Sequence, residues 1–156
     1  MRIRKMKESD IGEIVKLIHD VYGQNDVRHF LRDLKIGLAD KKESPYRFED
    51  FFVVVIDEKI IAVGGAWALH YEPIARLDWF IVGKERQQKG IGSLLLRHIE
   101  NHLRKKKISI LVAETSSGKN YKAAVAFYQK NGFRKVAEID KYWEDGSSWV
   151  YFMKRF

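Results

Sequence analysis

The apolar residues of this chain follow a helical period near the N-terminus. Residues 2–7 are expected to form a first strand, and apolar positions then recur every three or four residues after Asp10, which predicts a helix. Asp10 is expected to cap this helix, with Glu13 as its capping-box partner. A second helix is expected over about 27–38, and the polar segment 39–49 is expected to be a loop.

The middle of the chain has the continuous apolar runs that are typical of buried strands. Residues 51–56 and 60–69 flank a short polar segment, which predicts two strands joined by a tight turn. Another strand is expected over 76–82, and alternation along it puts Arg76, Asp78, Phe80 and Val82 on one face.

The C-terminal half alternates between helical and strand-like patterns. We expect helices over about 90–105 and 121–130, and strands over 108–113, 133–139 and 148–153. Hairpins followed by alternating helices and strands indicate an α/β (α+β mixed) fold, in which helices flank a mixed sheet. No linker or repeat is visible, so residues 1–156 are interpreted as a single domain.

Composition narrows the classes of protein that this chain can belong to. Its 156 residues are 46% hydrophobic, which is enough for one domain with a core and excludes an intrinsically disordered chain. The absence of cysteine excludes disulfides, cysteine metal sites and a thiol nucleophile. The longest apolar run, 60–69, is too short to cross a bilayer, and no signal peptide is visible. We therefore expect a cytoplasmic protein with no membrane partner.

The net charge of +8 suits a ligand that carries phosphates, but it suits nucleic acid or an anionic surface equally well. A more specific feature is the segment after the predicted strand 76–82, where a loop with two glycines leads into a helix. The free N–H groups and the dipole at a helix start attract phosphate, and glycine lets the ligand approach the backbone. On pattern alone, an ordinary turn remains an alternative.

Two motifs resemble those of a known family. Gln87-x-x-Gly90-x-Gly92 follows an apolar strand and is similar to the acetyl-CoA signature of the GNAT superfamily of N-acetyltransferases. Downstream, the segment 126–133, Ala-Phe-Tyr-Gln-Lys-Asn-Gly-Phe, resembles the second hallmark of that family. The resemblance covers most of the chain and is clearest over 76–135.

The resemblance implies a GNAT-like sheet of about seven mostly antiparallel strands, splayed between strands 76–82 and 108–113. It also implies acetyl-CoA as the co-substrate, no metal, and pyrophosphate held by the amides around Gln88 to Ser93. Asn120 stands one residue earlier than a common asparagine position of the family, which is occupied here by Tyr121. The expected cofactor-binding residues are Phe80, Ile81, Val82, Gln87, Gln88, Lys89, Gly90, Ile91, Gly92, Ser93, Asn120, Tyr121, Phe127 and Tyr128.

Acetyl transfer to an amine needs a proton acceptor for the amine and a donor for the departing thiolate. Without cysteine, direct attack of the amine on the thioester is the simplest scheme. Tyr128 is the candidate general acid, because a phenol is protonated at neutral pH. Asp78 is the first candidate base and Glu114 the alternative, although each could be a structural carboxylate, with Arg76 as a partner for Asp78.

The acceptor is left open, as a small molecule or a protein amine. The aromatic residues Tyr142, Trp143, Trp149 and Tyr151, with nearby carboxylates, are candidates for lining its site. His98 and His102 have metal-compatible spacing, but solvated or packed histidines are the preferred interpretation. The basic run 104–107 is interpreted as a helix terminus rather than a nucleic-acid site. A CoA-binding sensor or scaffold without catalysis is the alternative function, and a basic nucleic-acid-binding domain is a third. The sequence leaves the oligomeric state open, although homodimers are common among related proteins.

Overall fold

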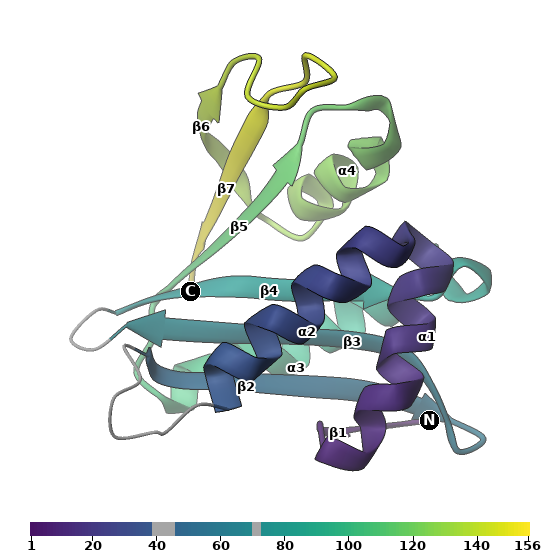
Figure 1. The fold of residues 1–156 in the computed structure, drawn as a ribbon. Coiled ribbons are helices and arrows are strands. Elements are labelled where there is room, and N and C mark those ends of the chain that lie inside the picture. The colour runs from purple at the N-terminus through teal and green to yellow at the C-terminus, as the bar shows by residue number, and fades with distance from the viewer. Residues whose placement is uncertain (39–45, 70–72) are drawn as a thin grey trace.

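The computed structural model describes residues 1–38, 46–69 and 73–156, which form one sheet with helices on both faces (Figure 1). Short 3-10 turns lie at Glu8–Asp10, Lys84–Arg86 and Lys119–Tyr121. The strands are β1 (Arg2–Lys5), β2 (Tyr46–Ile56), β3 (Lys59–Leu69), β4 (Ile74–Val82), β5 (Ile110–Ser116), β6 (Arg134–Ile139) and β7 (Trp149–Arg155). The helices are α1 (Ile11–Tyr22), α2 (Gln24–Leu38), α3 (Ile91–Lys105) and α4 (Lys122–Lys130).

The seven-stranded sheet has the order β1-β2-β3-β4-β5-β7-β6, and every pairing is antiparallel except β4 with β5. The parallel pairing covers only Ile74–Arg76 against Ile110–Val112. Beyond it the two strands diverge, and Figure 1 shows β5 and β7 leaving the plane of β2–β4. The mixed fold class and the splay between these strands are therefore confirmed.

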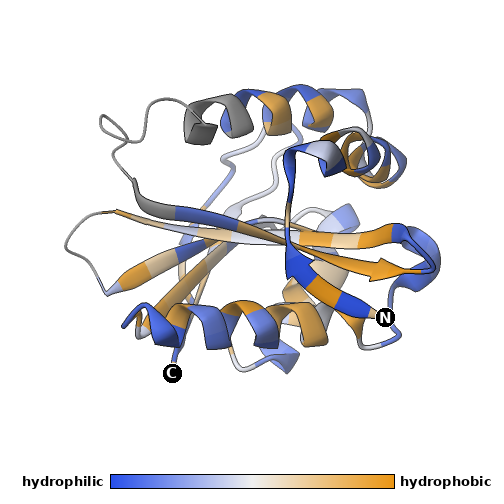
Figure 2. Ribbon diagram, turned by 90° about the horizontal axis from the view of Figure 1, so that it is seen from below, coloured by the Kyte–Doolittle hydropathy of each residue, from blue (hydrophilic) through white to orange (hydrophobic). Residues whose placement is uncertain are grey.

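Two apolar clusters hold the layers together. One lies between the sheet and α1–α2 and includes Ile14, Phe30 and Val63; the other lies on the α3 and α4 side. In Figure 2 the sheet runs between the helices of these two layers. No helix within the described residues is long and apolar enough to span a membrane.

Two local predictions near the N-terminus are wrong. Residues 46–49 of the predicted loop 39–49 form the start of β2, while 39–45 lie outside the described residues. Asp10 does not cap α1 through its side chain; it accepts hydrogen bonds from Arg4 and from the backbone N–H of Lys7. Glu13 instead accepts a hydrogen bond from the backbone N–H of Ile60, at 2.7 Å.

A β-bulge in β4 changes which residues face each layer. Gly65 pairs with Asp78 and Val63 with Ile81, so Gly64 alone faces Trp79 and Phe80. Trp79 has a φ of 41°, in the left-handed region. A Cβ on Gly64 would lie 2.6 Å from the Phe80 ring, so the bulge depends on a glycine at that position.

The bulge overturns the expectation that strict alternation puts Asp78, Phe80 and Val82 on one face. Phe80 and Val82 pack with the α3-side cluster, whereas Trp79 packs with the α1–α2 cluster. Asp78 stands opposite Gly65, whose strand neighbour Phe51 belongs to the α1–α2 cluster. The β4 segment therefore presents Asp78 and Phe80 to opposite sides of the sheet.

Candidate active site

The loop between β4 and α3 has the geometry of an anion site. Gly90 is the N-cap of α3 with a φ of 79°, and Gln88 also has a positive φ of 59°. The side-chain amide of Gln87 donates to the backbone oxygen of Val82 at 3.0 Å, which ties the loop to the end of β4. The unpaired N–H groups of the first turn of α3, including those of Gly92 and Ser93, are thereby held next to the strand.

Gly92 allows close contact between α3 and α4. A Cβ at this position would lie 3.0 Å from Cε2 of Phe127, tighter than an ordinary contact. Phe127 in turn stacks on Phe80, with ring centroids 5.3 Å apart and an interplanar angle of 29°. These aromatic rings link β4 to α4 on the α3 side of the sheet.

A cavity of about 240 Å³ adjoins the start of α3. Asn131 also lines it and donates from its side chain to the Phe127 backbone oxygen, at 2.8 Å. Lys154 of β7 lies 2.6 Å from buried Glu100 at its wall, and Arg97 adds a second cation. Sequence reasoning missed Arg97 and Lys154, because both lie outside the two motifs that carry the resemblance, and it gave no binding role to Asn131 of the second motif.

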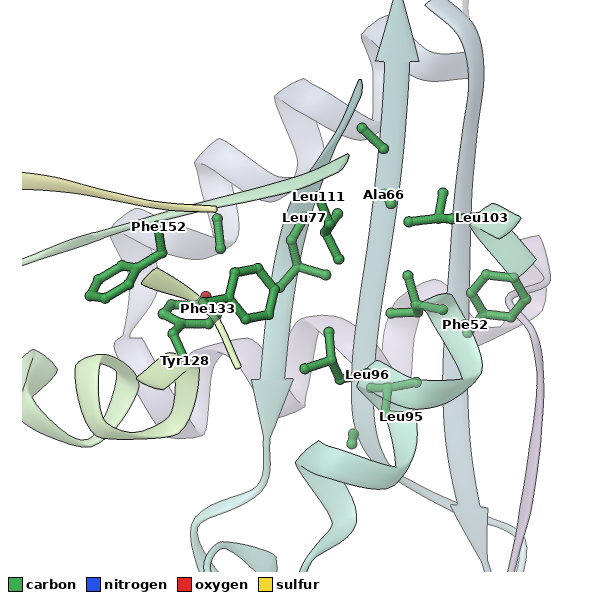
Figure 3. Close-up of a cluster of buried hydrophobic side chains, with 14 of the residues drawn as sticks. Phe52, Ala66, Leu77, Leu95, Leu96, Leu103, Leu111, Tyr128, Phe133 and Phe152 are labelled. Atoms are coloured by element: carbon green, nitrogen blue, oxygen red, sulfur yellow. The ribbon is translucent and has the colours of Figure 1, made fainter. Parts of the chain in front are cut away.

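Tyr128 is almost fully buried on α4, at 8% exposure. Its ring contacts those of Phe127, Phe133 and Phe152, and Figure 3 shows the last two gathered with it on the α4 side. Burial raises the pKa of Tyr128 well above its usual range, and Tyr22 and Glu114 contribute to the same rise. Its hydroxyl forms no hydrogen bond with the described residues, so it is available to a ligand as a protonated donor.

Asn120 and Tyr121 lie in the 3-10 turn that precedes α4, and both are exposed to solvent. Burial, followed by the charges of Asp26 and Asp145, raises the pKa of Tyr121. Tyr121 is thus close enough to feel the charge of Asp26, at the start of α2, and of Asp145, in the loop between β6 and β7. Neither residue contacts the glycine loop through a hydrogen bond.

Glu114 and Asp78 have different partners. Arg76 donates to Glu114 at 2.7 Å, and its guanidinium lies 5.4 Å from the centre of the Trp67 ring. The structural alternative that paired Arg76 with Asp78 is therefore wrong. Asp78 instead accepts a hydrogen bond from the backbone N–H of Trp79, at 2.9 Å.

Asp78 belongs to a group of carboxylates on the α1–α2 side of the sheet. Burial raises the pKa of Asp78 to about 7, and the charges of Glu49 and Asp33 add to the rise. Burial likewise raises the pKa of Glu49 to about 7, with contributions from Asp33 and Asp50. The sequence pattern gave no signal for Glu49, which stood in a segment expected to be a loop.

The aromatic residues near the C-terminus form a continuous chain. Tyr151 contacts Trp149 at 5.0 Å between ring centroids, Trp149 contacts Tyr142 at 4.5 Å, and Tyr142 contacts Trp143 at 4.9 Å. Tyr151 pairs with Glu114 across β5 and β7. The aromatic chain therefore starts beside the Arg76–Glu114 pair and runs outward along the hairpin.

The histidines on α3 pack against the core. The rings of His98 and His102 both pack edge to face with that of Phe52, with ring centroids 4.8 and 5.0 Å apart. Nε2 of His102 also lies 2.8 Å from Oδ2 of buried Asp50. In the part of the chain that the structure describes, no group of three or more acidic, histidine or cysteine side chains is arranged to hold a metal ion.

The family is decided by a match over residues 47–135, more than half of the chain, to the model of the acetyltransferase (GNAT) domain. The chain belongs to the GNAT family of N-acetyltransferases. The matched range contains the bulge, the glycine loop and Tyr128. A comparison with curated protein sequences returned no significant match.

Solved structures show the same fold at low sequence identity. A protein from Desulfovibrio desulfuricans assigned to the GNAT family has a TM-score of 0.86 and 18% identity, over 99% of this chain and 98% of that one. The ribosomal-protein-S18-alanine N-acetyltransferase of Escherichia coli has a TM-score of 0.78 and 18% identity, over 99% of this chain and 92% of that one. An aminoglycoside 6′-N-acetyltransferase complexed with coenzyme A has a TM-score of 0.77 and 13% identity, over 99% of this chain and 97% of that one.

Proposed function

We propose that this GNAT protein transfers the acetyl group of acetyl-CoA to a primary amine, by direct attack within a ternary complex. The observation that carries the proposal is the divergence of β4 and β5. At this divergence, Phe80 and Phe127 face the glycine-loop side and Asp78 faces the opposite side. A thioester arm and an amine can therefore approach the same point of β4 from opposite faces.

On the donor side, the start of α3 fits a pyrophosphate group. Its amides converge at Gly90–Ser93, and Lys89 adds positive charge beside them. The cavity next to this helix start is lined by Arg97, which is placed to pair with a further phosphate, whereas Lys154 at the same cavity is paired with Glu100. Phe80, Ile81 and Val82 lack a β5 partner, so the backbone groups of this edge that neither β3 nor the Gln87 side chain engages can bond an extended pantetheine arm.

On the acceptor side, Asp78 is the better candidate for the general base. Burial raises the pKa of Asp78 to about 7, which suits a base that acts near neutral pH, whereas Glu114 is held by Arg76. The amine gives its proton to Asp78, directly or through water, and its nitrogen forms a bond to the acetyl carbon as the C–S bond breaks. Tyr128 donates a hydrogen bond to the departing sulfur. Its raised pKa favours this donation over complete proton transfer.

The test uses a property of the sequence itself. Because the protein contains no cysteine, a thiol reagent detects only the CoA that is released from acetyl-CoA. We expect acetyl-CoA to raise the melting temperature by mass action, and a panel of primary amines to give amine-dependent CoA release. Stabilisation by CoA with no release from any amine would favour the sensor alternative. Salt-sensitive DNA binding without stabilisation by CoA would favour a nucleic-acid-binding protein.

A further inference from the structure

Glu49 lies on the same face of the sheet as Asp78, although the two residues are far apart in the sequence. In the sheet, Glu49 of β2 pairs with Trp67 of β3. Two residues further along β2, Phe51 pairs with Gly65, and Gly65 pairs in turn with Asp78 of β4. No register shift separates Glu49 from Phe51, so both side chains point to the α1–α2 side. At Gly65 itself β3 has no side chain, and the Phe51 ring occupies the space that a Cβ there would need, while Trp67 stands between Glu49 and Arg76.

Neither carboxylate has a cationic partner among the described residues. The guanidinium of Arg76, on the same face, is engaged by Glu114 at 2.7 Å. Asp33 adds a third carboxylate, which is paired with Arg32 at 3.2 Å and accepts from the indole N–H of Trp79 at 3.3 Å. Because two neighbouring, partly buried carboxylates without a cationic partner are costly to ionise together, this arrangement favours a cationic ligand.

A separate observation points to the same ligand chemistry. A row of aromatic rings starts beside the Arg76–Glu114 pair. It leads from Tyr151 through Trp149 to Tyr142 and ends at exposed Trp143. Aromatic ring faces attract cations, and they favour organic cations over hydrated metal ions. The described residues also lack a metal-binding group.

We propose that Glu49 is a specificity-determining residue for acceptors that carry a second cationic group besides the amine that is acetylated. This inference rests on the proposed function and names its substrate class as diamines and larger polycationic amines. The second ammonium group of the acceptor binds Glu49 and compensates its charge. With that charge compensated, Asp78 loses its proton more readily and can accept one from the reacting amine.

The test compares monoamines with α,ω-diamines of matched length, from propylamine and 1,3-diaminopropane to hexylamine and 1,6-diaminohexane. We expect wild-type kcat/KM to favour the diamine of the best length. At a pH well above 7, where Asp78 is ionised with either residue at position 49, Glu49→Gln is expected to lower that preference about tenfold, as for the loss of a partly desolvated charged contact. The matched control is Glu58→Gln in the β2–β3 turn, where the carboxylate is exposed and pairs with Arg2. An unchanged preference in Glu49→Gln would overturn the proposal.

A binding measurement separates this inference from the proposed function. N,N,N′,N′-tetramethyl-1,4-diaminobutane is a dication that cannot form a stable amide, and its affinity for the CoA-bound protein can be measured by calorimetry. Affinity that depends on Glu49 supports the inference even if no amine is acetylated. Equal affinity for wild type, Glu49→Gln and the more conservative Glu49→Asp overturns it even if acetylation occurs.

Discussion

On the α3 side of the β4–β5 divergence, the proposed binding groups are main-chain amides from one short segment, residues 87–93. On the opposite side, they are carboxylates brought together from β2, β4 and β5. The amides need no compensating charge, because a helix start is intrinsically positive. Burial, followed by neighbouring negative charges, raises the pKa of Asp78 and of Glu49, so ionising these two carboxylates costs free energy in the unliganded protein. A donor common to all members of a family can be bound by backbone, whereas the acceptor requires side chains that can change.

The largest expected effect is at the point where the two sides meet. Tyr128→Phe removes only the hydroxyl and should lower kcat about 100-fold, with the KM for acetyl-CoA nearly unchanged. Stopped assays at saturating acetyl-CoA measure kcat, and the CoA-induced rise in melting temperature serves as the control for folding. An unchanged kcat would remove Tyr128 from the chemistry.

The next effect concerns the acceptor side alone. Since an ionised Asp78 is required, wild-type kcat/KM should rise with pH through about 7. Asp78→Asn should lose this rise, which is the acidic limb of the pH profile, and its kcat/KM should be about tenfold or more lower at pH 8. Glu114→Gln is the matched variant and should keep the limb. If only Glu114→Gln lost the limb, the base would be Glu114.

The donor side can be tested with two glycines of the same backbone conformation. Gly90 and Gly146 have φ of 79° and 77°, and an added Cβ would meet no atom within 4 Å at either position. Alanine should therefore destabilise the fold similarly at both, by about 1 kcal/mol. Only Gly90→Ala should raise the KM for acetyl-CoA, by about fivefold, a change that corresponds to ~1 kcal/mol. Equal KM values for the two variants would place the phosphate elsewhere.

The smallest effect is a gain in stability on the acceptor side. The folded state raises the pKa of Asp78 from 3.8 to about 7, so it holds that proton more tightly than the unfolded chain. Stability should thus fall as the pH rises from about 4 to about 7, and this cost should persist above pH 7. Urea unfolding should show Asp78→Asn to be about 1 kcal/mol more stable than wild type at pH 8, but not at pH 4. A difference in unfolding free energy between Asp78→Asn and wild type that is independent of pH would mean that ionisation of Asp78 does not destabilise the folded state.

The sequence predicted what is local and missed what depends on register. The strand, the glycine loop and α3 are consecutive, so their order alone indicated a phosphate site. The bulge at Trp79 has no glycine or proline of its own, because the residue that permits it, Gly64, lies on the neighbouring strand. Without that bulge, alternation placed Phe80 beside Asp78.

Contacts between residues that are far apart in the sequence could not be predicted from the sequence pattern either. Arg76 is two residues from Asp78 in the sequence, yet its partner is Glu114 on the next strand. Glu49 could be recognised only after β2 and β3 had been aligned. Lys154 likewise reaches Glu100 from the last strand. The acceptor side is built almost entirely from such long-range neighbours, so its prediction from sequence stayed incomplete.

The short parallel joint between β4 and β5 has a consequence for aggregation. From Leu77 onward, β4 keeps an unpaired strand edge in the middle of the finished sheet, and apolar Phe80, Ile81 and Val82 lie along it. Edges of this kind recruit strands from other chains, which most proteins prevent with charges or covering loops. A ligand that bonds along β4 would close this edge. The cellular supply of CoA would then also act as protection against self-association.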